Sequence, residues 1–467
     1  MMKTGDPLLT AWEQTLARQR DEPALFDRQR SVLARFGEIE ECSRRLGTVG
    51  GGLQAFEAGE IVAIQIGNHA HWPALFLACL RRGIVALPLE QTMSEQERAA
   101  ALNTCRVAGL MTTPEQPMAR LAAAGAIEWG EHVPVLLKLT SGTTAAPRAI
   151  RFRSAQLLAD AVQICDTMGI TAADLNFAVI PVSHSYGFSN LLTPLLVRGV
   201  PLAMSSDRMP RAVLDDLART ESTVFPGTPI FFQAFGEMLE TPRLPNLRLC
   251  ISAGAPLSCA VARKFREKFG RAIHSFYGAS ECGGICYDHA ATGEVEGFVG
   301  PALRGVELQA LDAAAGATQV RVRSAAVGDG YFPQAEVGKL GADSFLPDDL
   351  VTMSDAGLRL VGRLSDVINV AGKKVNPAEV EAHLLSFAGV RQAVVFGRAS
   401  SLRNQEVVAC VVAAEETDEA SLLEFCRAHL SGWQVPKRIF LRATIPANER
   451  GKISRRELAE YFADRNL

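Results

Sequence analysis

The sequence predicts an α/β protein with a large N-terminal domain, built on mostly parallel sheets with flanking helices, and a small α+β C-terminal domain. The first indication is an alternation of patterns: a buried strand at 60–66, a helix at 71–82 and a second strand at 84–89. The second is the length of 467 residues, which exceeds the usual size of one domain. The third is a change of pattern near residue 365, where a further set of strands and helices begins.

The composition limits the classes of function. Hydrophobic residues make up 48% of the chain, enough for a large core, and the net charge is -3. The sequence has neither the pattern of a secretory signal nor an apolar run long enough to span a bilayer. Its ten cysteines lack paired metal-ligand spacing, which is typical of reduced intracellular thiols. We therefore expect a cytoplasmic protein with no nucleic-acid partner and no integral membrane association.

Further elements of the large domain continue the alternation. A helical pattern at 31–53 precedes the first strand, and two more buried strands are expected at 177–182 and 247–252. Residues 319–341 read as short β segments separated by Gly and Pro turns. These elements extend the predicted large domain to residue 364.

The small domain has its own elements. They are strands at 393–397 and 407–413 and helices at 377–387 and 420–430. The linker is expected near 364–366, which divides the chain into domains 1–364 and 365–467. A basic turn at 448–453 lies near the end of the chain and, by itself, reads as a solvated surface.

The run at 139–148, LTSGTTAAPR, is the most informative stretch of the chain. An apolar strand at 135–137 enters it, and a helical pattern follows from about residue 154. Backbone N–H groups and hydroxyls in such a strand–turn–helix suit the oxygens of a phosphate chain, and Arg148 adds a permanent charge. An ordinary solvated turn is the alternative. The run is not a Walker-type loop, because the G-x-x-x-x-G-K-[ST] spacing is absent.

Three later segments follow strands of the expected sheet. Ligands in open α/β sheets bind beyond the carboxyl ends of the strands, so His184 is a site candidate, although an ordinary loop histidine is an equal alternative. The small residues at 254–256 allow a flat ligand to lie against the backbone. The run at 277–281, YGASE, combines a ring that could stack on a base, a hydroxyl for a phosphate and a carboxylate for Mg²⁺. For the tyrosine alone, core packing is the ordinary role.

Taken in order, these stretches resemble the adenylate-forming enzyme superfamily over nearly the whole chain. That superfamily contains acyl- and aryl-CoA synthetases, carrier-protein adenylation domains and firefly luciferase. The resemblance implies an AMP-binding adenylation domain at 1–364 and a mobile domain at 365–467 that carries a catalytic lysine. It also implies ATP-dependent activation of a carboxylic acid to an acyl-adenylate, followed by transfer to a thiol.

The resemblance assigns site residues one by one. It implies catalytic roles for Lys452, which binds the carboxylate and α-phosphate, for Glu281, which holds Mg²⁺, and for His184, which gates the acyl pocket or assists deprotonation of the thiol. Asp355 matches the carboxylate on the ribose hydroxyls. The other nucleotide- and acceptor-binding positions are Thr140, Ser141, Gly142, Thr143, Thr144, Arg148, Gly254, Ala255, Pro256, Tyr277, Gly278, Ala279, Ser280, Arg363 and Gly372.

The chain departs from the pattern of the superfamily at several positions. Ala145, Arg148 and Ala149 stand where Gly, Lys and Gly are usual in the phosphate loop. Arginine keeps the charge but loses the compact ammonium, and the alanines restrict the turn. Other departures are Ser354, Ser365 at the hinge and Asn448. No charged catalytic group is removed, so we expect activity, while the rate and the affinity for ATP are left open.

The expected chemistry accounts for these residue types. The attacking carboxylate and the α-phosphate are both anions, so Lys452 and a Mg²⁺ ion on Glu281 would neutralise their repulsion. Positioning and electrostatics should supply most of the rate. In the superfamily the small domain then rotates, withdraws the lysine and presents the Gly372 loop for the second step.

The acid and its acceptor are less narrowly predicted. The segment 185–190 has no carboxylate to pair with a substrate ammonium, which disfavours an amino acid, and 225–232 offers apolar surface. We expect a fatty or aryl acid. The expected acceptor, supplied in trans, is CoA, with the phosphopantetheine of a separate carrier protein as the alternative; Lys373 and Lys374 would suit either. A catalytically weak nucleotide-binding protein is a further alternative, because the phosphate loop is altered.

Overall fold

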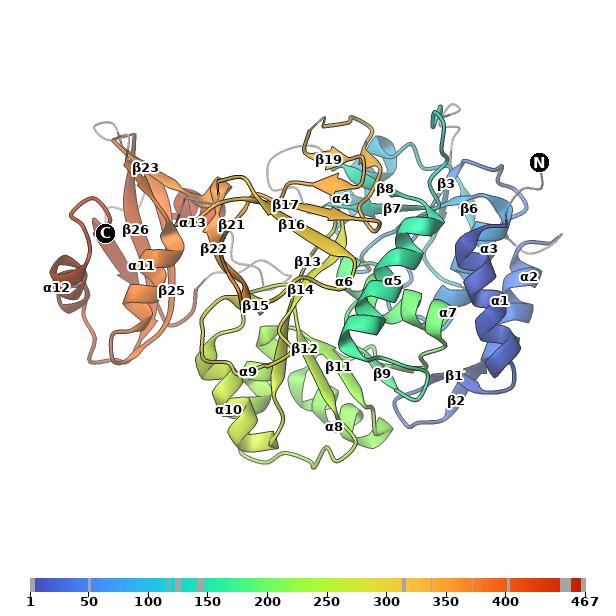
Figure 1. Cartoon of the computed structure of the whole chain (residues 1–467), viewed down its shortest axis with the longest axis horizontal. Helices are drawn as coiled ribbons and strands as arrows, with labels where there is room; N and C mark the ends of the chain where they lie inside the picture. Colours follow the sequence, from blue (N-terminus) through green and yellow to red (C-terminus); the bar gives the residue numbers. More distant parts are fainter. Residues whose placement is uncertain are drawn as a thin grey trace. The chain divides into compact units, whose positions relative to one another are not determined.

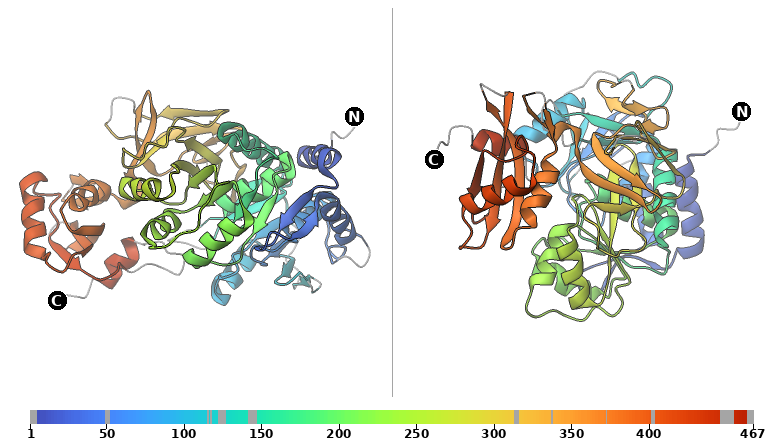
Figure 2. Two further views of the ribbon diagram at one scale, coloured as in Figure 1. Left: turned by 90° about the horizontal axis from the view of Figure 1, so that it is seen from below. Right: turned by 60° about the vertical axis from the view of Figure 1, so that its left-hand side comes forward.

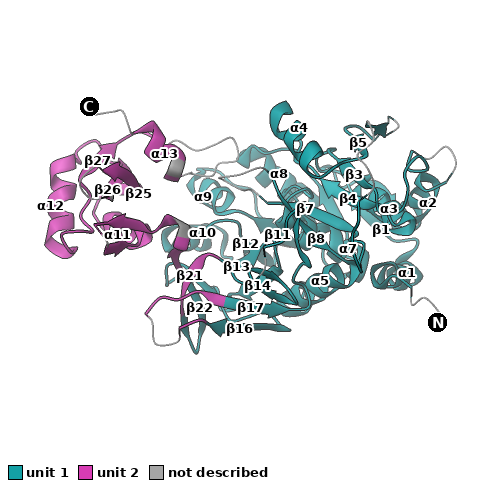
Figure 3. Ribbon diagram, turned by 90° about the horizontal axis from the view of Figure 1, so that it is seen from above, with its two compact units in different colours: residues 1–310, 321–347, 353–359 teal, residues 311–320, 348–352, 360–467 magenta. Residues whose placement is uncertain are grey.

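The computed structural model describes residues 5–48, 52–114, 116, 118–121, 127–140, 147–312, 316–336, 338–371, 373–400, 404–445 and 455–462. The chain divides into two compact units (Figure 3). Unit 1 comprises residues 1–310, 321–347 and 353–359, and unit 2 comprises residues 311–320, 348–352 and 360–467. The domain boundary between residues 364 and 365 stays a prediction.

The largest sheet of unit 1 has eight strands in the order β14-β13-β12-β11-β9-β10-β1-β2. The pairs from β13 to β1 are parallel, whereas the edge pairs β13–β14 and β1–β2 are antiparallel. Every residue of β11 and β12 is buried, as is typical of parallel strands covered on both faces. The strands are β14 (Gly283–Tyr287), β13 (Ile273–Ala279), β12 (Leu249–Ser252), β11 (Val224–Gly227), β9 (Asn176–Ala178), β10 (Leu202–Met204), β1 (Pro23–Phe26) and β2 (Val32–Arg35).

The second large sheet has seven strands in the order β18-β8-β7-β4-β3-β5-β6. Its centre, β7-β4-β3-β5, is parallel, and β8, β18 and β6 add antiparallel pairs. The predicted mostly parallel sheets are therefore confirmed. The strands are β18 (Gly330–Phe332), β8 (Ala149–Phe152), β7 (Leu136–Leu139), β4 (Val85–Pro88), β3 (Ile61–Ile64), β5 (Gly109–Met111) and β6 (Ala119–Arg120).

Helices cover these sheets (Figure 1). Helix α5 packs against α1 and α7, helix α9 packs against α8 and α10, and α1, α2 and α3 pack together (Figure 2). The helices of unit 1 are α1 (Pro7–Gln19), α2 (Phe36–Leu46), α3 (Trp72–Arg82), α4 (Glu95–Thr104), α5 (Ser154–Met168), α6 (Ser185–Gly187), the π-helix η1 (Phe188–Leu192), α7 (Thr193–Arg198), α8 (Pro210–Thr220), α9 (Pro229–Glu237) and α10 (Cys259–Phe269). None of the helices within the described ranges combines the length and apolar character needed to cross a membrane.

The prediction of one helix over 31–53 is wrong at its start. Residues Val32–Arg35 form β2, which pairs antiparallel with β1 before α2 begins at Phe36. The apolar residues of this short segment fit a helical period as well as a strand, and only the long-range pairing decides between them.

Two small sheets contain the strands within which the boundary between the two units falls. The three-stranded sheet has the order β15-β22-β21, and the four-stranded sheet has the order β16-β17-β20-β19. The boundary falls within β17, β21 and β22. The strands are β15 (Phe298–Gly300), β22 (Gly357–Arg363), β21 (Asp349–Ser354), β16 (Val306–Ala310), β17 (Val320–Ser324), β20 (Ser344–Phe345) and β19 (Leu340–Gly341).

Unit 2 is an α+β fold around a five-stranded sheet, as predicted. Two apolar clusters cover the sheet: one includes Val380 and Leu422 from its helices α11 and α12, and the other includes Leu458 and Phe462 near α13. The elements are η2 (Leu364–Asp366), β23 (Ile368–Val370), β24 (Lys373–Val375), α11 (Pro377–Leu385), β25 (Val390–Ser400), β26 (Asn404–Ala413), α12 (Glu419–His429), β27 (Arg438–Leu441) and α13 (Arg455–Tyr461).

Candidate active site

The stem of the predicted phosphate loop is an antiparallel pair. Strand β7 leads into the loop and β8 leaves it, with Leu139 opposite Ala149. Thr140 donates from its backbone N–H to the Arg148 carbonyl over 2.9 Å, and its Oγ1 donates to the same oxygen over 3.3 Å. Thr140 and Arg148 are therefore adjacent. Ser141, Gly142, Thr143 and Thr144, together with Ala145, lie outside the described residues.

The predicted strand–turn–helix is wrong in one respect. Strand β8 stands between the loop and α5, because it pairs with β7 on one side and with β18 on the other. Helix α5 begins at Ser154, as predicted, but a full strand separates it from the loop. Phosphate recognition at this position would rest on the loop, its stem and Arg148, without the N-terminus of α5.

Arg148 has an acidic partner and an aromatic one. Its Nη1 lies 2.7 Å from the Glu336 Oε2, and both side chains are partly exposed, at 41% and 45%. The guanidinium carbon lies 3.9 Å from the centre of the Tyr331 ring. Exposed ion pairs contribute little to stability, so phosphate oxygens could take the place of Glu336 at low cost.

Glu281 belongs to the same cluster, and its carboxylate is partly buried. Burial raises the pKa of Glu281, while a hydrogen bond from Tyr331 and the charges of Arg148 and Lys339 act in the opposite direction. The Tyr331 hydroxyl donates to the Glu281 Oε1 over 3.0 Å. A carboxylate desolvated in this way favours a bound cation.

The surroundings of Glu281 fit Mg²⁺ better than a fully protein-coordinated metal. Across the described part of the chain, the structure contains no group of three or more His, Cys, Asp or Glu side chains that could hold a metal ion. Mg²⁺ commonly takes one or two carboxylates, with phosphate oxygens and water completing its octahedron. Glu281, which shares its contact with Tyr331 with Arg148 of the predicted phosphate loop, matches this requirement.

The YGASE motif begins within a strand. Tyr277, Gly278 and Ala279 belong to β13, which pairs with β14 and has an irregular register after Tyr277. A Cβ at Gly278 would lie 2.7 Å from the Gly283 carbonyl oxygen, so this position requires glycine. Tyr277 is half-buried, which leaves part of its ring accessible, and Ser280 follows the strand.

The His184 segment meets the end of β13. The Ser185 hydroxyl donates to the Ser280 Oγ over 2.9 Å. His184 is exposed, and its Nδ1 accepts the Tyr186 backbone N–H over 3.2 Å, so the proton of the neutral ring lies on Nε2. The Tyr186 hydroxyl donates to the Ile251 carbonyl over 3.2 Å. The segment beyond β9 thus contacts β12 and the residue that follows β13, as expected near the carboxyl edge of a parallel sheet.

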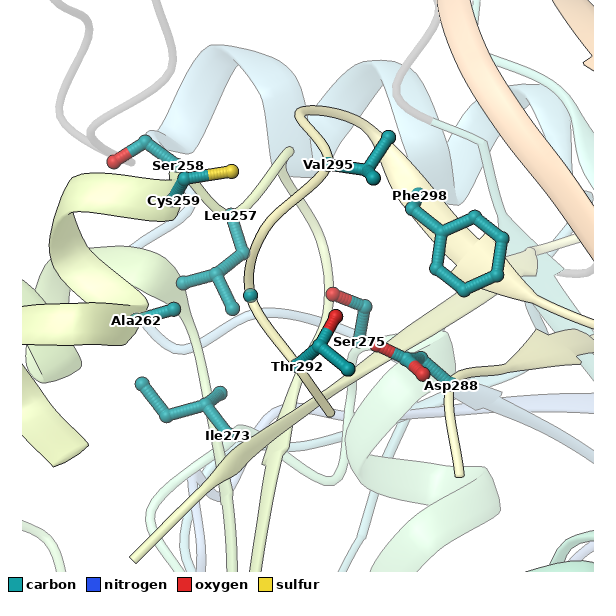
Figure 4. Close-up of a pocket in the computed structure, with 11 residues that line it drawn as sticks. Leu257, Ser258, Cys259, Ala262, Ile273, Ser275, Asp288, Thr292, Val295 and Phe298 are labelled. Atoms are coloured by element: carbon teal, nitrogen blue, oxygen red, sulfur yellow. The ribbon is translucent and has the colours of Figure 1, made fainter. Parts of the chain in front are cut away.

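The turn at Gly254, Ala255 and Pro256 follows β12 and is exposed. Gly254 has a φ of +85°, which other residues rarely adopt. Leu257, the residue that follows this turn, lines a pocket of about 300 Å³, part of which is open solvent. Ser275 and Asp288 are among its other lining residues (Figure 4). The Asp288 carboxylate already accepts from the N–H groups of Ala290 and Ala291, over 3.1 and 3.0 Å.

The remaining predicted residues lie beyond this cluster in the sequence. Asp355 occupies the exposed turn between β21 and β22 in unit 1. Arg363 ends β22 in unit 2, where its Nε lies 2.8 Å from the Asp349 Oδ1. Gly372 and Lys452, as well as Asn448, lie outside the described residues. Next to Gly372, the Lys373 ammonium lies 3.7 Å from the centre of the Trp433 ring.

Two family models match this chain: AMP-binding enzyme over residues 12–136 and 127–332, and AMP-binding enzyme C-terminal domain over residues 379–452. The chain belongs to the AMP-binding enzyme family. A probable CoA ligase of Humulus lupulus is 26% identical to this AMP-binding enzyme. The match covers 86% of the present chain and 87% of the ligase. The 3,4-dihydroxybenzoate–(aryl-carrier protein) ligase of Bacillus anthracis is 27% identical over 71% and 75% of the two chains.

A solved structure shows the same fold. ATP-bound MatB from Rhodopseudomonas palustris superposes on this AMP-binding enzyme with a TM-score of 0.84 at 22% identity, covering 97% of this chain and 99% of MatB. The predicted fold class is confirmed by this likeness, and the predicted adenylate-forming superfamily by the family models. The prediction of an acid–thiol ligase is confirmed at the level of enzyme class.

Sequence reasoning did not single out several residues that contact the predicted site of this AMP-binding enzyme. Tyr331 and Glu336 lie in a segment that shows only short β patterns, and their partners are 50 and 188 residues away. No local signal points to such pairings. In the segment after β9, the sequence pattern indicated His184 as the site residue and not the neighbouring Ser185.

A buried charge beneath the site was also missed, although a signal existed. Lys138 interrupts the apolar run of β7, and its Nζ lies 3.4 Å from the Ser189 Oγ and 4.7 Å from the centre of the Phe152 ring. Burial lowers the pKa of Lys138, and the charge of Asp160 opposes this shift. Asp160 accepts the Gly284 N–H over 3.0 Å. Asp160 of α5 thus binds the backbone of β14, and its charge acts on Lys138 of β7.

Proposed function

We propose that this AMP-binding enzyme uses ATP to convert a fatty or aryl carboxylic acid to an acyl-adenylate, with release of pyrophosphate, and then transfers the acyl group to CoA. The observation that carries the proposal is the cluster at the phosphate-loop stem. There the cation Arg148 and the partly buried carboxylate Glu281 both contact Tyr331. A permanent cation beside a carboxylate that favours Mg²⁺ is the arrangement needed for a triphosphate.

The residues of unit 1 have distinct roles in this proposal. Thr140 and Arg148, with the loop between them, hold the phosphates, and Glu281 holds Mg²⁺, which would supply Lewis-acid stabilisation of the leaving pyrophosphate. The exposed backbone at Gly254, Ala255 and Pro256 and the face of Tyr277 bind the adenine, and Ser280 binds the α-phosphate. Asp355 binds the ribose hydroxyls. Each of these groups orients ATP rather than reacting with it.

Different residues of unit 2 act in the two half-reactions of this proposal. In the first, a carboxylate oxygen attacks the α-phosphorus as the bond to pyrophosphate breaks, and Lys452 neutralises the charge that the two anions bring together. In the second, the thiolate of the acceptor attacks the acyl carbon and AMP leaves. We assign the Gly372 loop to this step, with Arg363 and Ser365 near the hinge.

The class of acid follows from the residues beyond β9. Tyr186, Ser189 and Asn190 are buried there, and the segment 185–190 provides no carboxylate for a substrate ammonium. The aromatic residues at 225–232 contribute less than the sequence suggests. Phe225 and Phe232 are fully buried and pack on each other with ring centres 5.5 Å apart, so they shape the core around the site.

The carrier-protein alternative stays open for the acceptor. The relative from Bacillus anthracis is named for an aryl-carrier protein, whereas the relative from Humulus lupulus is named a CoA ligase. Lys373 follows Gly372 in the sequence and lies over the ring of Trp433. These two side chains would suit the phosphates or the adenine of CoA as well as the phosphopantetheine of a carrier.

A panel of fatty, aryl and amino acids tests the proposal. Each acid is incubated with ATP and Mg²⁺ and scored by pyrophosphate release, and then with CoA or a phosphopantetheinylated carrier protein and scored by thioester. We expect release with fatty or aryl acids and thioester on CoA. Thioester on the carrier alone would replace CoA as the acceptor. The absence of acid-dependent pyrophosphate exchange would leave a nucleotide-binding protein without ligase activity.

A further inference from the structure

Tyr331 and Arg148 are neighbours because of the register of the seven-stranded sheet. Strand β18 is an edge strand, and it pairs antiparallel with β8 so that Tyr331 lies opposite Ile150. Arg148 precedes Ile150 by two residues and therefore lies on the same face, diagonally across from Tyr331. The 3.9 Å separation between the guanidinium carbon and the ring centre follows from this geometry.

The same strand is also joined to Glu281. The Gly328 N–H, just before β18, donates to the Glu281 carbonyl over 2.9 Å. The Tyr331 hydroxyl then reaches the Glu281 Oε1 over 3.0 Å. Tyr331 is only 2% exposed, so its ring and hydroxyl have little freedom to move. The side chain of Tyr331 thus contacts both Arg148, the proposed phosphate-binding cation, and Glu281, the proposed metal-binding carboxylate.

We propose that Tyr331 is a positioning residue that sets the phosphate-binding cation and the metal-binding carboxylate in register, and that Glu336 holds Arg148 until the phosphates of ATP replace it. The hydroxyl fixes the orientation of the Glu281 carboxylate, as hydrogen bonds to metal-binding carboxylates commonly do. The ring face fixes the plane of the guanidinium. Mg²⁺ and Arg148 must engage the same phosphate chain, so their spacing decides how tightly the complex is bound.

The two halves of this assignment predict effects of opposite sign. Tyr331→Phe keeps the ring that stacks on Arg148 but removes the hydroxyl from Glu281. It should raise the Mg²⁺ concentration for half-maximal ATP binding about tenfold, and change ATP binding without Mg²⁺ much less. Glu336→Gln removes the competitor for Arg148 and should tighten ATP binding about two- to fivefold, with or without Mg²⁺.

Calorimetric titration with ATP over a series of Mg²⁺ concentrations, and in EDTA, measures both effects as equilibrium binding. Tyr287→Phe is the matched control for Tyr331→Phe, because it removes a hydroxyl from another buried tyrosine of unit 1. Asp215→Asn is the control for Glu336→Gln, since Asp215 forms an exposed pair with Arg211 over 2.9 Å on α8. Both controls should titrate like the unmodified protein.

The outcomes separate the role of Tyr331 from the proposed function, on which it rests. If the unmodified protein shows acid-dependent pyrophosphate exchange but Tyr331→Phe keeps its Mg²⁺ requirement, the positioning role is overturned. Weaker ATP binding by Glu336→Gln would overturn the holding role of Glu336, and this exposed substitution tests that role even if Tyr331→Phe fails to fold. A lack of exchange in the unmodified protein would instead overturn the ligase function.

Discussion

Arg148 in unit 1 and Arg455 in unit 2 hold their charges in contrasting ways. The guanidinium of Arg148 pairs with one partly exposed carboxylate and lies on the Tyr331 ring. The guanidinium of Arg455 donates to the Val395 carbonyl over 3.0 Å, to Asp366 over 2.5 Å and to both oxygens of Glu381 over 2.9 and 3.0 Å. The side chains of Asp366 and Glu381 are only 25% and 15% exposed.

The difference separates a cation that can exchange partners from one that is a structural anchor. All three nitrogens of Arg455 are engaged, and they tie the start of α13 to α11, β25 and the short helix η2. Among the residues that the structure describes, Arg148 stacks on one ring and forms one ion pair, which a phosphate could displace. The proposed catalytic Lys452 precedes the anchor by three residues. We infer that Arg455 fixes one end of the segment that carries it.

The largest effect is expected from the lysine itself. Lys452→Ala should lower the rate of adenylation about 10²- to 10³-fold, as is typical when one group that stabilises transition-state charge is removed. Thioester formation from synthetic acyl-adenylate should persist. Pyrophosphate exchange measures the first step, and thioester yield from the synthetic adenylate measures the second. Equal loss of both steps would contradict the role assigned to Lys452.

Loss of the Arg455 guanidinium should lower the stability of unit 2. Arg455→Met leaves Asp366 and Glu381 without their cation and should cost about 2–3 kcal/mol of unfolding free energy, since half-buried carboxylates would lose charge-assisted hydrogen bonds. Urea denaturation measures this change. Arg455→Lys, which keeps the charge but not the fork of donors, should recover part of it. An unchanged denaturation midpoint for Arg455→Met would make the anchor dispensable.

Loss of the Arg148 guanidinium should instead weaken the binding of ATP. Arg148→Ala should raise the KM for ATP about tenfold, because a charge-assisted contact to phosphate is lost, and lower the unfolding free energy by less than about 1 kcal/mol. Steady-state kinetics and urea denaturation of the same variant measure the two quantities. A large loss of stability with an unchanged KM would reverse the comparison with Arg455.

A third arginine extends the comparison to pH. Burial raises the pKa of Asp174, but hydrogen bonds from Arg248, Thr171 and Thr223 outweigh it and hold this pKa below its usual value. Such a carboxylate contributes stability above its unfolded pKa of about 3.9, and the contribution is lost as the pH falls through the lower folded value. Asp174→Asn should therefore cost about 1–2 kcal/mol at neutral pH and progressively less in acid. A cost that is constant with pH would exclude this linkage.

The amino-acid pattern predicted these buried elements because each of them lies in a continuous apolar run of the sequence. The buried strand at 60–66, the helix at 71–82 and the strand at 84–89 correspond to β3, α3 and β4. The pattern failed where arginines interrupt the apolar residues. Val32–Arg35 pairs with β1, and Ala149–Phe152 pairs with β7 and β18, but Arg35 and Arg151 leave neither segment with the continuous apolar run of β3 or β4.

The candidate site divides along the same line. Residues within one motif, such as Tyr277, Ser280 and Glu281, could be named from the sequence because they are neighbours in the chain. The contact of Ser185 with Ser280, and that of Tyr331 with Glu281, join segments 95 and 50 residues apart. No local pattern carries information about such contacts.

The sequence alone determined the class of this protein, because ordered motifs and hydrophobic periodicity are properties of the chain itself. It also determined which residue types were available for an anionic substrate and a metal ion. Tertiary structure alone decided that Arg148 lies on Tyr331 and pairs with Glu336, that Glu281 is partly buried, and that three nitrogens of Arg455 are held by hydrogen bonds. Burial and strand register depend on which distant segments pack together, and these two conditions decide whether a charge stays free to meet a ligand.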